Sequence, residues 1–389
     1  MKIFFSVGEP SGDLHTAHLI TEFNKRVPQF EAVGYGGPKM AEAGCDNFYL
    51  LTNLAVMGIF QVIPLIGKFL KLVYQAGKYF KQSPPDAVVL VDFSGFNWWI
   101  ARKAKAAGIP VFYYMPPQLW AWAPKRIWKV RKFVDHVLCG HQFEYEWYRK
   151  QGIDAHFVGH PFFDEVAHHP LDTNFVNKQR SAEKFHITVL PGSRNQEVQH
   201  NFPAMLQVMQ QLHQKHSHVK FLVANFKESQ KDVCVQMLQK MGVSLPITFE
   251  VGKTSECIEA SDCCLMCSGS VSLELLARNK PAVVIYCLSR LSAYVLRKVL
   301  TIDHLTLTNL IAGKRLMPEF IIGGSPAPYI QEMTESLSEW VAKPEKLNNV
   351  KKEMAIICSE VAQTGATTRA AETILSLLNV TEASISRAA

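Results

Sequence analysis

Short apolar runs recur along this chain, and most of them are followed by a loop of small or polar residues and then by a segment with helical spacing. These runs span residues 3–7, 32–35, 87–91, 111–114, 136–139 and 155–158 and, after a polar interval, residues 188–190, 221–224, 247–250, 262–266 and 282–286. Strands that alternate with helices in this way form parallel sheets with helices on both faces. We therefore expect an α/β protein with two doubly wound, Rossmann-like domains facing a cleft, residues 1–165 and 166–359, joined by a polar linker over 162–184.

The composition is that of a globular protein. Of the 389 residues, 48% are hydrophobic and 19% are charged, which fits two domains with substantial cores. The chain enters its first predicted strand without the apolar segment of a signal peptide, and no apolar stretch reaches the roughly 18 residues of a membrane-spanning helix. These features predict a cytoplasmic protein.

Four of the nine cysteines cluster at Cys257, Cys263, Cys264 and Cys267. Three of them fall in or next to a predicted strand, where alternate side chains face opposite ways. No partner histidine or further Cys-x-x-Cys pair lies at zinc spacing. We expect buried free thiols here and no metal site.

Two loops in the second half of the chain each follow a predicted strand and precede a predicted helix. Small residues at such a turn let backbone N–H groups approach an anion, and the helix N-terminus adds partial positive charge. Arg194 adds a cation suited to phosphate oxygens, and Glu274 is placed to accept hydrogen bonds from ribose hydroxyls. The alternative is that both loops are plain turns. The candidate residues of a nucleotide diphosphate site are Gly192, Ser193, Arg194, Glu197, Ser268, Gly269, Ser270 and Glu274.

The first half of the chain is basic and aromatic. Between Asp46 and Asp135 twelve lysines and arginines face only two acids, Asp86 and Asp92. Residues 65–81 have the spacing of an amphipathic helix that carries lysines on one side, which predicts either a solvated helix over a core or an interfacial membrane helix. The candidate membrane residues are Phe60, Ile63, Lys68, Phe69, Lys71 and Lys78. A basic patch also permits nucleic-acid binding, but a nucleic-acid binder leaves the strand-end loops unexplained, so we expect none.

Further motifs occur in order along nearly the whole chain. They are Gly8-Glu9-Pro10-Ser11-Gly12-Asp13, Gly34 to Pro38 with Met40, Ala55 to Gly58, Val91-Asp92 with Phe96-Asn97, Pro117 to Trp122, Arg126, Phe157 to Pro161, Leu190 to Arg194 with Glu197, Ser268 to Ser270 with Leu273-Glu274, Asn309-Leu310 and Pro318-Glu319. Together they resemble the lipid-A-disaccharide synthases, a family of glycosyltransferases with the GT-B fold.

The resemblance implies an inverting hexosyltransferase of lipid A biosynthesis. Such an enzyme joins a UDP-linked acylated sugar donor, UDP-2,3-diacylglucosamine, to an acylated sugar-phosphate acceptor, 2,3-diacylglucosamine 1-phosphate, and forms the β-1,6 disaccharide and UDP. It implies an acceptor-binding N-terminal domain, a UDP-sugar-binding C-terminal domain, and final helices over 360–389 that pack back on the N-terminal domain. It also implies a peripheral enzyme on the anionic inner face of the inner membrane, with an oligomer possible. No Asp-x-Asp pair, the metal motif of other glycosyltransferases, occurs, so we expect neither metal nor cofactor.

Inversion needs a base that removes the proton of the acceptor hydroxyl. Asp92 is the candidate because it ends a predicted strand and is nearly the only acid in a basic region, and the resemblance points to the same position. The alternative is that Asp92 caps the helix starting near Asn97 or pairs with an arginine. Glu9 is the second catalytic candidate, as a residue that binds sugar hydroxyls or orients the base.

The remaining candidates bind the acceptor or a sugar. Ser11 and Asp13 either bind sugar hydroxyls or cap helices, and Trp120 and Trp122 either hold sugar faces and acyl chains or pack in the core. The acceptor and sugar-binding candidates are Ser11, Asp13, Asn97, Gln118, Trp120, Trp122, Arg126 and Asn309.

The chain departs from the family pattern at Gly95, where the family has a second acid, and at Thr308, where it has proline. The alternative functions are another UDP-sugar GT-B enzyme, namely a peptidoglycan-precursor transferase or a UDP-sugar epimerase, and a non-catalytic lipid or nucleotide-sugar binding protein.

Overall fold

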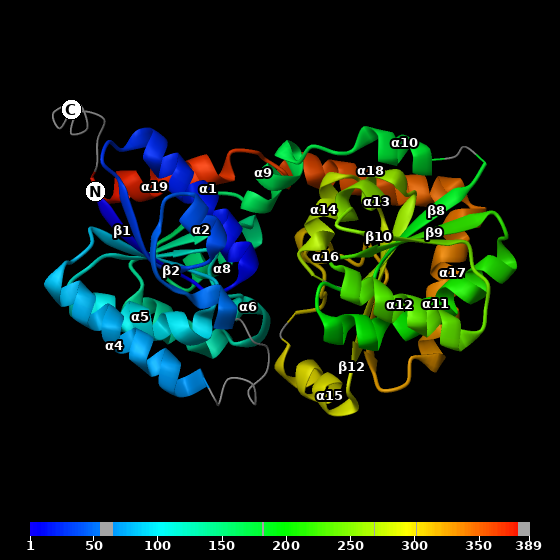
Figure 1. The fold of residues 1–389 in the computed structure, drawn as a ribbon, viewed down its shortest axis with the longest axis horizontal. Coiled ribbons are helices and arrows are strands. Elements are labelled where there is room, and N and C mark those ends of the chain that lie inside the picture. Colours follow the sequence, from blue (N-terminus) through cyan, green and yellow to red (C-terminus); the bar gives the residue numbers. More distant parts are fainter. Residues whose placement is uncertain (55–64, 181–182, 268, 301, 380–389) are drawn as a thin grey trace. The chain divides into compact units, whose positions relative to one another are not determined.

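The computed structural model describes residues 1–54, 65–180, 183–267, 269–300 and 302–379. The chain divides into two compact units. Unit 1 comprises Met1–Asp164 and Gln363–Ala389, and unit 2 comprises Glu165–Ala362 (Figure 1). The C-terminal helix α19 (Ala366–Leu377) therefore belongs to unit 1, where it packs against α1 (Pro10–Arg26).

Unit 1 is built on a seven-stranded sheet in which every pair of neighbouring strands is parallel, in the order β3-β2-β1-β4-β5-β6-β7. The strands are β1 (Lys2–Val7), β2 (Glu31–Gly36), β3 (Asp46–Leu50), β4 (Ala87–Val91), β5 (Val111–Tyr114), β6 (His136–Cys139) and β7 (Ala155–Phe157). Besides α1 and α19, its helical elements are α2 (Pro38–Glu42), η1 (Leu51–Leu54), α4 (Ile66–Gln82), α5 (Ser94–Ala106), α6 (Leu119–Trp122), η3 (Pro124–Arg126), α7 (Ile127–Phe133), α8 (Gln142–Lys150) and the start of α9 (Pro161–His168).

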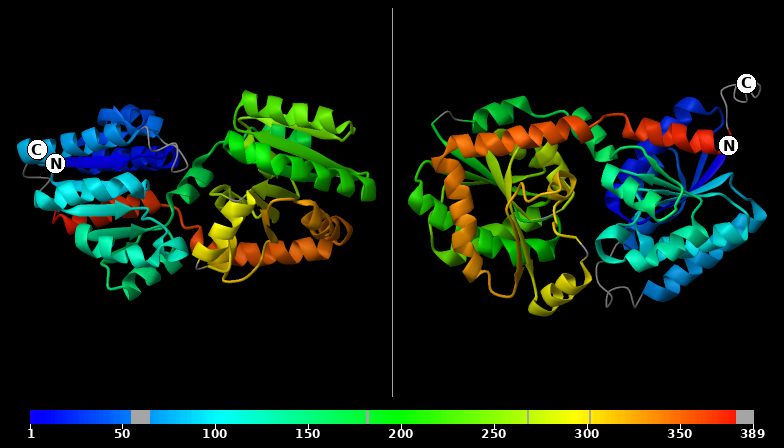
Figure 2. Two further views of the ribbon diagram at one scale, coloured as in Figure 1. Left: turned by 90° about the horizontal axis from the view of Figure 1, so that it is seen from below. Right: turned by 180° about the vertical axis from the view of Figure 1, so that it is seen from behind.

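Alternation along the strands gives this sheet a separate core on each face. On β1, Phe4 joins the core beneath α4 and α5, whereas Ile3 and Phe5 join the core beneath α1 and α19. Figures 1 and 2 show these two pairs of helices on opposite sides of the sheet. Strands buried on both faces explain why the sequence shows continuous apolar runs such as residues 87–91.

Unit 2 has a six-stranded parallel sheet in the order β10-β9-β8-β11-β12-β13. Its strands are β8 (Phe185–Leu190), β9 (Val219–Asn225), β10 (Ile247–Val251), β11 (Cys263–Cys267), β12 (Ala282–Leu288) and β13 (Glu319–Gly323). Its helices are α10 (Thr173–Gln179), α11 (Asn195–Lys215), α12 (Glu228–Met241), α13 (Thr254–Ala260), α14 (Val271–Ala277), α15 (Arg290–Val299), α16 (Leu307–Ala312), α17 (Ala327–Ala342) and α18 (Pro344–Val361).

Every strand predicted from the sequence is present, but the sequence analysis missed β3 and β13. The predicted linker over 162–184 is also wrong, because helices α9 and α10 occupy most of it. The Asp172 carboxylate accepts a hydrogen bond from the Phe175 amide and so caps the start of α10, which explains how a polar segment forms a helix there.

In each sheet the strand order reverses at one point, between β1 and β4 in unit 1 and between β8 and β11 in unit 2. At such a point the loops that follow the two central strands diverge and leave a crevice at the carboxyl ends of the strands, where open α/β sheets bind ligands. The catalytic and UDP-binding candidates follow these four strands, whereas Gln118, Trp120, Trp122 and Arg126 follow β5 and Asn309 follows β12.

Candidate active site

Asp92 is the first residue after β4, at the reversal point of the unit 1 sheet. Asp92 and Phe93 both adopt a left-handed backbone, with φ values of 47° and 38°, which non-glycine residues rarely do. Such strain persists only where surrounding contacts fix the conformation. Within the described residues no ion pair or helix-capping hydrogen bond uses the Asp92 carboxylate, and the N-cap of α5 is Phe93. Neither alternative predicted for Asp92, a helix cap or an ion pair with an arginine, is therefore found in the part of the chain that the structure describes.

The backbone of Asp92 is held by two side chains from neighbouring elements. Its carbonyl accepts a hydrogen bond from Asn97 Nδ2 at 2.9 Å and another from the Tyr113 hydroxyl at 2.6 Å. Asn97 is fully buried, donates also to the carbonyls of Ser6 and Val91, and accepts from Ser6 Oγ at 2.6 Å. Asn97 thus ties the ends of β1 and β4 together, so its amide positions the Asp92 loop.

Two glycines let the loops after β1 and β4 approach each other. A Cβ on Gly12, in the first turn of α1, would lie 3.0 Å from Asp92 Oδ2, and one on Gly8 would lie 2.3 Å from the Phe93 ring. A side chain on Gly8 would displace the Phe93 ring, and one on Gly12 would shift the Asp92 carboxylate by a few tenths of an ångström.

The surroundings of Asp92 favour its protonated form. Burial raises the pKa of the Asp92 carboxyl to about 7, and the Glu9 carboxylate adds to the rise by repulsion. Glu9 is half-buried at the N-cap position of α1. A carboxylate with a pKa near 7 is well matched to general-base catalysis at neutral pH.

Ser11 and Asp13 differ in environment although both lie in the first turn of α1. Ser11 is exposed. The buried Asp13 carboxylate accepts hydrogen bonds, each 3.0 Å long, from the amides of Gly37, Lys39 and Met40. Asp13 therefore caps α2, a helix other than its own.

Trp120 and Trp122 also differ. Trp120 is buried, donates from Nε1 to Glu144 at 3.1 Å and stacks edge-on against Phe143. Burial raises the pKa of Glu144 to about 7. Trp122 is partly exposed and lies 5.1 Å from the Arg126 guanidinium, in a cation–π contact. The exposed Gln118 precedes both at the N-cap of α6.

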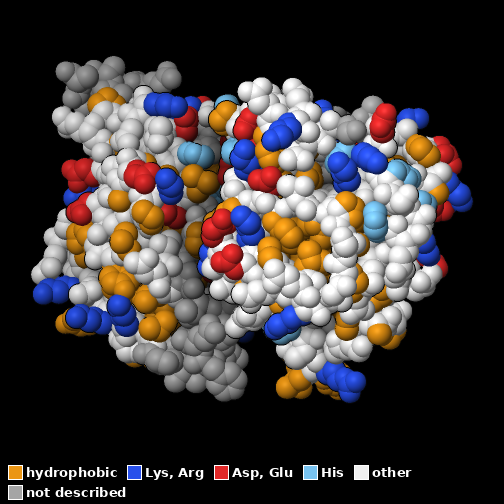
Figure 3. All heavy atoms as spheres, turned by 45° about the vertical axis from the view of Figure 1, so that its right-hand side comes forward, with side chains coloured by type: hydrophobic (Ala, Val, Ile, Leu, Met, Phe, Trp, Pro, Cys, Tyr) orange, Lys and Arg blue, Asp and Glu red, His pale blue; other side chains and the backbone are white. Residues whose placement is uncertain are grey.

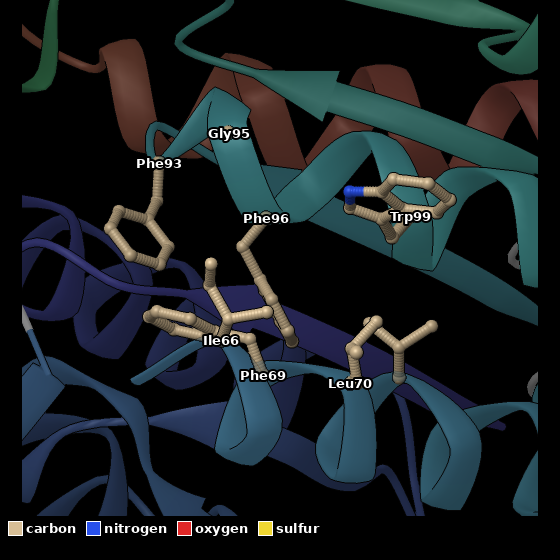
Figure 4. Close-up of a pocket in the computed structure, with 8 residues that line it drawn as sticks. Ile66, Phe69, Leu70, Phe93, Gly95, Phe96 and Trp99 are labelled. Carbon is tan, nitrogen blue, oxygen red and sulfur yellow. The ribbon is translucent and has the colours of Figure 1, made fainter. Parts of the chain in front are cut away.

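An apolar cavity of about 320 Å³ opens beside the Asp92 loop, between α4 and α5 (Figure 4). Its walls come from the N-terminal half of α4 and from the segment directly after Asp92. The lining residues are Ile66, Phe69, Leu70, Val73, Phe93, Gly95, Phe96 and Trp99. Because Phe93 and Gly95 follow Asp92 within three positions, the cavity and the candidate base share one loop.

The outer face of α4 is more apolar than the sequence indicated. Ile66, Leu70 and Tyr74, spaced four residues apart, are exposed, whereas Phe69 is half-buried against Phe93 and Phe96. Lys68, Lys71 and Lys78 are exposed, and Lys68 also covers the Tyr49 ring. Phe60 and Ile63 lie outside the described residues.

In unit 2 the loop after β8 is closed by its own helix. Glu197 accepts hydrogen bonds from the amides of Ser193 and Arg194, at 2.9 and 3.1 Å, and pairs with the Arg194 guanidinium. Gly192 has a φ of 131°, and a Cβ there would lie 2.4 Å from Glu197 Cβ. In this conformation the two amides and Nη1 of Arg194 all serve Glu197, and about half of the Arg194 side chain is exposed.

The loop after β11 leads into α14, where Glu274 is buried. The Glu274 carboxylate accepts a hydrogen bond from Arg278 Nε at 2.9 Å, and both side chains are less than a tenth exposed. Gly269 is exposed and Ser270 precedes α14, while Ser268 lies outside the described residues. The loops after β8 and β11 flank the reversal point of this sheet, as nucleotide-binding loops do.

Asn309 belongs to unit 2, whereas the other acceptor candidates belong to unit 1. It is buried, its Oδ1 accepts from the amides of Leu316 and Met317, and its Nδ2 donates to the Met317 carbonyl. Since an asparagine side chain makes about four hydrogen bonds, Asn309 is mainly committed to this turn.

Three residues that the sequence analysis missed support these loops. Glu144 anchors Trp120, and Arg278 pairs with Glu274. Gln230, at the start of α12, donates to the Ser193 carbonyl at 2.9 Å. No local motif marks Glu144 and Gln230, because each reaches its partner from another element, whereas the i, i+4 spacing of Arg278 to Glu274 is a local signal that could have identified it.

Cys263, Cys264 and Cys267 are buried free thiols, as predicted. The one His/Cys/Asp/Glu group in the described ranges whose donor atoms converge is His136, Asp154 and His156, where Asp154 accepts from His136 at 2.7 Å and also contacts Arg149. None of the described helices has the length and apolar character needed to cross a membrane.

The comparisons with known proteins cover nearly the whole chain. The model of the Lipid-A-disaccharide synthetase family matches residues 3–374. The Lipid-A-disaccharide synthase of Idiomarina loihiensis is 32% identical over 364 residues, which are 93% of this chain and 96% of that protein.

Solved structures share the fold. A UDP-GlcNAc 2-epimerase from Neisseria meningitidis bound to UDP-GlcNAc has a TM-score of 0.66 at 13% identity, over 97% of this chain and 100% of that one. The calicheamicin glycosyltransferase CalG4 has a TM-score of 0.57 at 13% identity, over 97% and 98%. The predicted pair of Rossmann-like domains of the GT-B type is confirmed by these likenesses and by the two parallel sheets. With a family model matched from residue 3 to residue 374 and a relative 32% identical over almost its full length, the chain belongs to the lipid-A-disaccharide synthase family.

Proposed function

We propose that this protein transfers 2,3-diacylglucosamine from UDP to the 6-hydroxyl of 2,3-diacylglucosamine 1-phosphate, with inversion at the anomeric carbon. The observation that carries the proposal is Asp92, a half-buried residue with a left-handed backbone and a carboxyl of raised pKa, beside an apolar cavity. An epimerase acting on UDP-sugars has no need for an acyl-sized cavity beside its catalytic base.

In the proposed reaction Asp92 takes the proton of the acceptor hydroxyl as its oxygen forms a bond to the anomeric carbon of the donor. The bond between that carbon and the β-phosphate oxygen breaks, and UDP leaves with the electron pair. Glu9 holds the pKa of Asp92 high and lies where a sugar hydroxyl can reach it. Ser11, Gln118, Trp122 and Arg126 border the same strand ends and supply contacts for the acceptor.

Unit 2 is assigned to the UDP moiety. Arg194 faces the diphosphate and stabilises the charge that develops on it as the sugar departs. Glu274, oriented by its ion pair with Arg278, accepts hydrogen bonds from the ribose hydroxyls. Glu197 and Gln230 fix the loop that carries Arg194. UDP-GlcNAc bound by a protein of the same fold supports a UDP-sugar as the donor.

The cavity between α4 and α5 takes an acyl chain of a substrate. Its lining is aromatic and aliphatic, and burying methylene groups there is worth roughly 0.8 kcal/mol each. The exposed Ile66, Leu70 and Tyr74, with Lys68, Lys71 and Lys78, form the outer face of α4 and suit an anionic bilayer surface on the cytoplasmic side of the inner membrane.

The test is turnover of the purified protein with both acylated substrates in detergent micelles, with EDTA present, beside Asp92→Asn. Release of UDP with formation of the disaccharide, and a loss of about 10²–10⁴-fold in the variant, is the expected result. Exposed Ser217→Ala is the matched control for purification and should keep full activity. Production of a 2-epimer of the donor in place of disaccharide would support the epimerase alternative. UDP binding without turnover would support a non-catalytic binding protein.

A further inference from the structure

Helix α15 of unit 2 has an apolar stripe on the face that points away from the core of unit 2. Leu291, Tyr294 and Val295 are 74%, 58% and 50% exposed, and with Lys298 they follow the i, i+3, i+4, i+7 spacing of one helix face. Three large apolar side chains side by side on one short helix are unusual for a solvated surface, where such residues are normally scattered singly.

The opposite face of α15 is seated on β13. Ala293 is buried, and a Cβ on Gly323 would lie 2.6 Å from the Ala293 Cβ. The Arg290 side chain crosses Gly324 in the same way, and the Ser289 hydroxyl caps the helix by accepting from the Ser292 amide at 3.1 Å. These contacts fix the rotation of α15 about its own axis, so its apolar stripe faces away from β13.

The chain segment that carries the stripe has charges of one sign. No aspartate or glutamate occurs between Glu274 and Asp303, whereas α15 contributes Arg290 and Lys298. The Lys298 ammonium lies 4.7 Å from the Tyr294 ring centroid, at the edge of the stripe. Figure 3 shows hydrophobic and cationic side chains together at the lower end of unit 2, where Figure 1 places α15.

We propose that α15 lies in the surface of an anionic bilayer, with Leu291, Tyr294 and Val295 in the boundary between headgroups and acyl chains. Lys298, at the edge of the stripe, then contacts lipid phosphates. Short helices with apolar residues on one face and cations beside them bind in this way, and their attraction to anionic lipid adds to the burial of apolar area. This inference rests on the proposed function in one respect, because the acylated substrates are the reason for choosing a bilayer as the surface. It adds a lipid contact in unit 2 to the one proposed for α4.

A second copy of the chain is the rival occupant of the stripe. In a twofold pair the same face meets itself, so the cations of one α15 would approach those of its partner with no acid of the helix to compensate them. Anionic lipid carries the charge opposite to that of α15, whereas a second copy would bring like charges together.

The test measures co-sedimentation of the full chain with vesicles of phosphatidylglycerol and phosphatidylethanolamine, against vesicles of phosphatidylcholine. The variant L291S/Y294S/V295S is expected to lower partitioning to the anionic vesicles about tenfold or more. Its matched control is F226S/I356S, which removes two exposed apolar residues of unit 2 outside α15 and should bind as the wild type does. Lys298→Glu should weaken binding more at low salt than at high salt.

Hydrogen exchange of residues 290–299 gives a direct readout, with protection expected on adding anionic vesicles and absent with phosphatidylcholine. Unchanged partitioning of the triple variant together with unchanged exchange would overturn the proposal. A wild-type dimer that the triple variant converts to a monomer, with protection in the absence of lipid, would assign the stripe to a second copy. Turnover in detergent should be the same in the triple variant as in the wild type. A wild type that binds vesicles through α15 yet forms no disaccharide would refute the proposed function and leave this inference standing.

Discussion

The Asp92 carboxylate lies directly over Gly12, whose missing side chain leaves room for it, since a Cβ there would come within 3.0 Å of Asp92 Oδ2. Gly12 follows β1 and Asp92 follows β4, the two central strands of the unit 1 sheet. The two residues are 80 positions apart in the sequence and meet at the point where the strand order reverses. The first turn of α1 is thus shaped to accept a carboxylate rather than merely to begin a helix.

Gly12→Ala should therefore lower activity without unfolding unit 1. The added methyl group displaces the Asp92 carboxylate by a few tenths of an ångström, and misplacement of a catalytic group by such amounts costs about 10- to 100-fold in kcat/KM. Alanine also favours the helix, so the melting temperature should hold or rise. Steady-state kinetics and thermal melting check both, with Gly67→Ala, which meets nothing within 4 Å, as the control in another helix. Equal kinetics in both variants would contradict the assignment of Asp92.

The pH dependence of kcat/KM should show an acid limb with an apparent pKa near 7. The base must be deprotonated to work, and burial, aided by Glu9, raises the pKa of Asp92 to about 7. The value of kcat/KM therefore rises with pH up to about pH 7 and is constant above it. Glu9→Gln removes the repulsion and should move the acid limb to lower pH, even where the maximal rate also falls. A limb that stays in place would show that Glu9 acts on substrate alone.

Much of the fold was predictable because its signals are local. Each buried parallel strand is a continuous apolar run, and each following loop carries small or polar residues, so the strand ends that hold Glu9, Asp92 and Arg194 could be identified. The two missed strands lie at sheet edges: β3 alternates half-buried with exposed residues, and β13 begins at Glu319, so neither reads as a continuous buried run.

What the candidate residues do in the site was less predictable, because side-chain partners are set by packing. Asp13 and Asn97 occur in motifs that suggest ligand binding, yet the structure directs both to backbone groups. Sequence position reveals that a polar residue ends a strand or starts a helix. It does not reveal which distant amide or carbonyl lies within 3 Å of that residue.

The ion pair of Glu274 with Arg278 should show strong coupling in a double-mutant cycle. Removing only Arg278, as in Arg278→Met, leaves a buried carboxylate without its partner and should destabilise the protein by about 3 kcal/mol. Glu274→Gln/Arg278→Met should recover part of that loss, because no unpaired charge remains. Chemical denaturation measures the stabilities, and calorimetry should show weaker UDP binding for every variant of Glu274. Additive effects on stability would mean that the two groups do not depend on each other.

Filling the cavity beside the Asp92 loop should change substrate preference by acyl length. Gly95 lines the cavity, and a Cβ there would meet nothing within 4 Å, so Gly95→Leu adds volume without a backbone clash. The KM for a long-chain substrate should rise about tenfold while that for a short-chain analogue changes little. The two analogues serve as each other's control within one variant. A parallel rise of both KM values would place the acyl chain elsewhere.

Three buried histidines should make unit 1 sensitive to acid. His141 stacks on Phe143 at 5.3 Å and on His160 at 4.9 Å, and His15 lies edge-on to His160. Burial lowers the pKa of His15 and of His141 to about 4 and that of His160 well below its usual value. Between pH 6.5 and 4 these histidines therefore bind protons in the unfolded chain but not in the folded protein. The shifts of His15 and His141 each remove up to about 3 kcal/mol from the free energy of unfolding as pH falls through that window.

Asp92 and Glu144 act in the opposite sense over the same window, because their raised pKa values make the folded protein hold protons that the unfolded chain has lost. The total pH profile thus mixes both effects, and only a difference between variants isolates the histidines. His141→Phe keeps an aromatic ring against Phe143 and removes the titrating group, so the variant should lose less stability than the wild type as the pH falls from 6.5 to 4. Chemical denaturation at each pH measures the difference, and exposed His218→Gln is the control, whose curve should run parallel to that of the wild type. A parallel curve for His141→Phe as well would mean that His141 becomes charged in the folded protein as readily as in the unfolded chain.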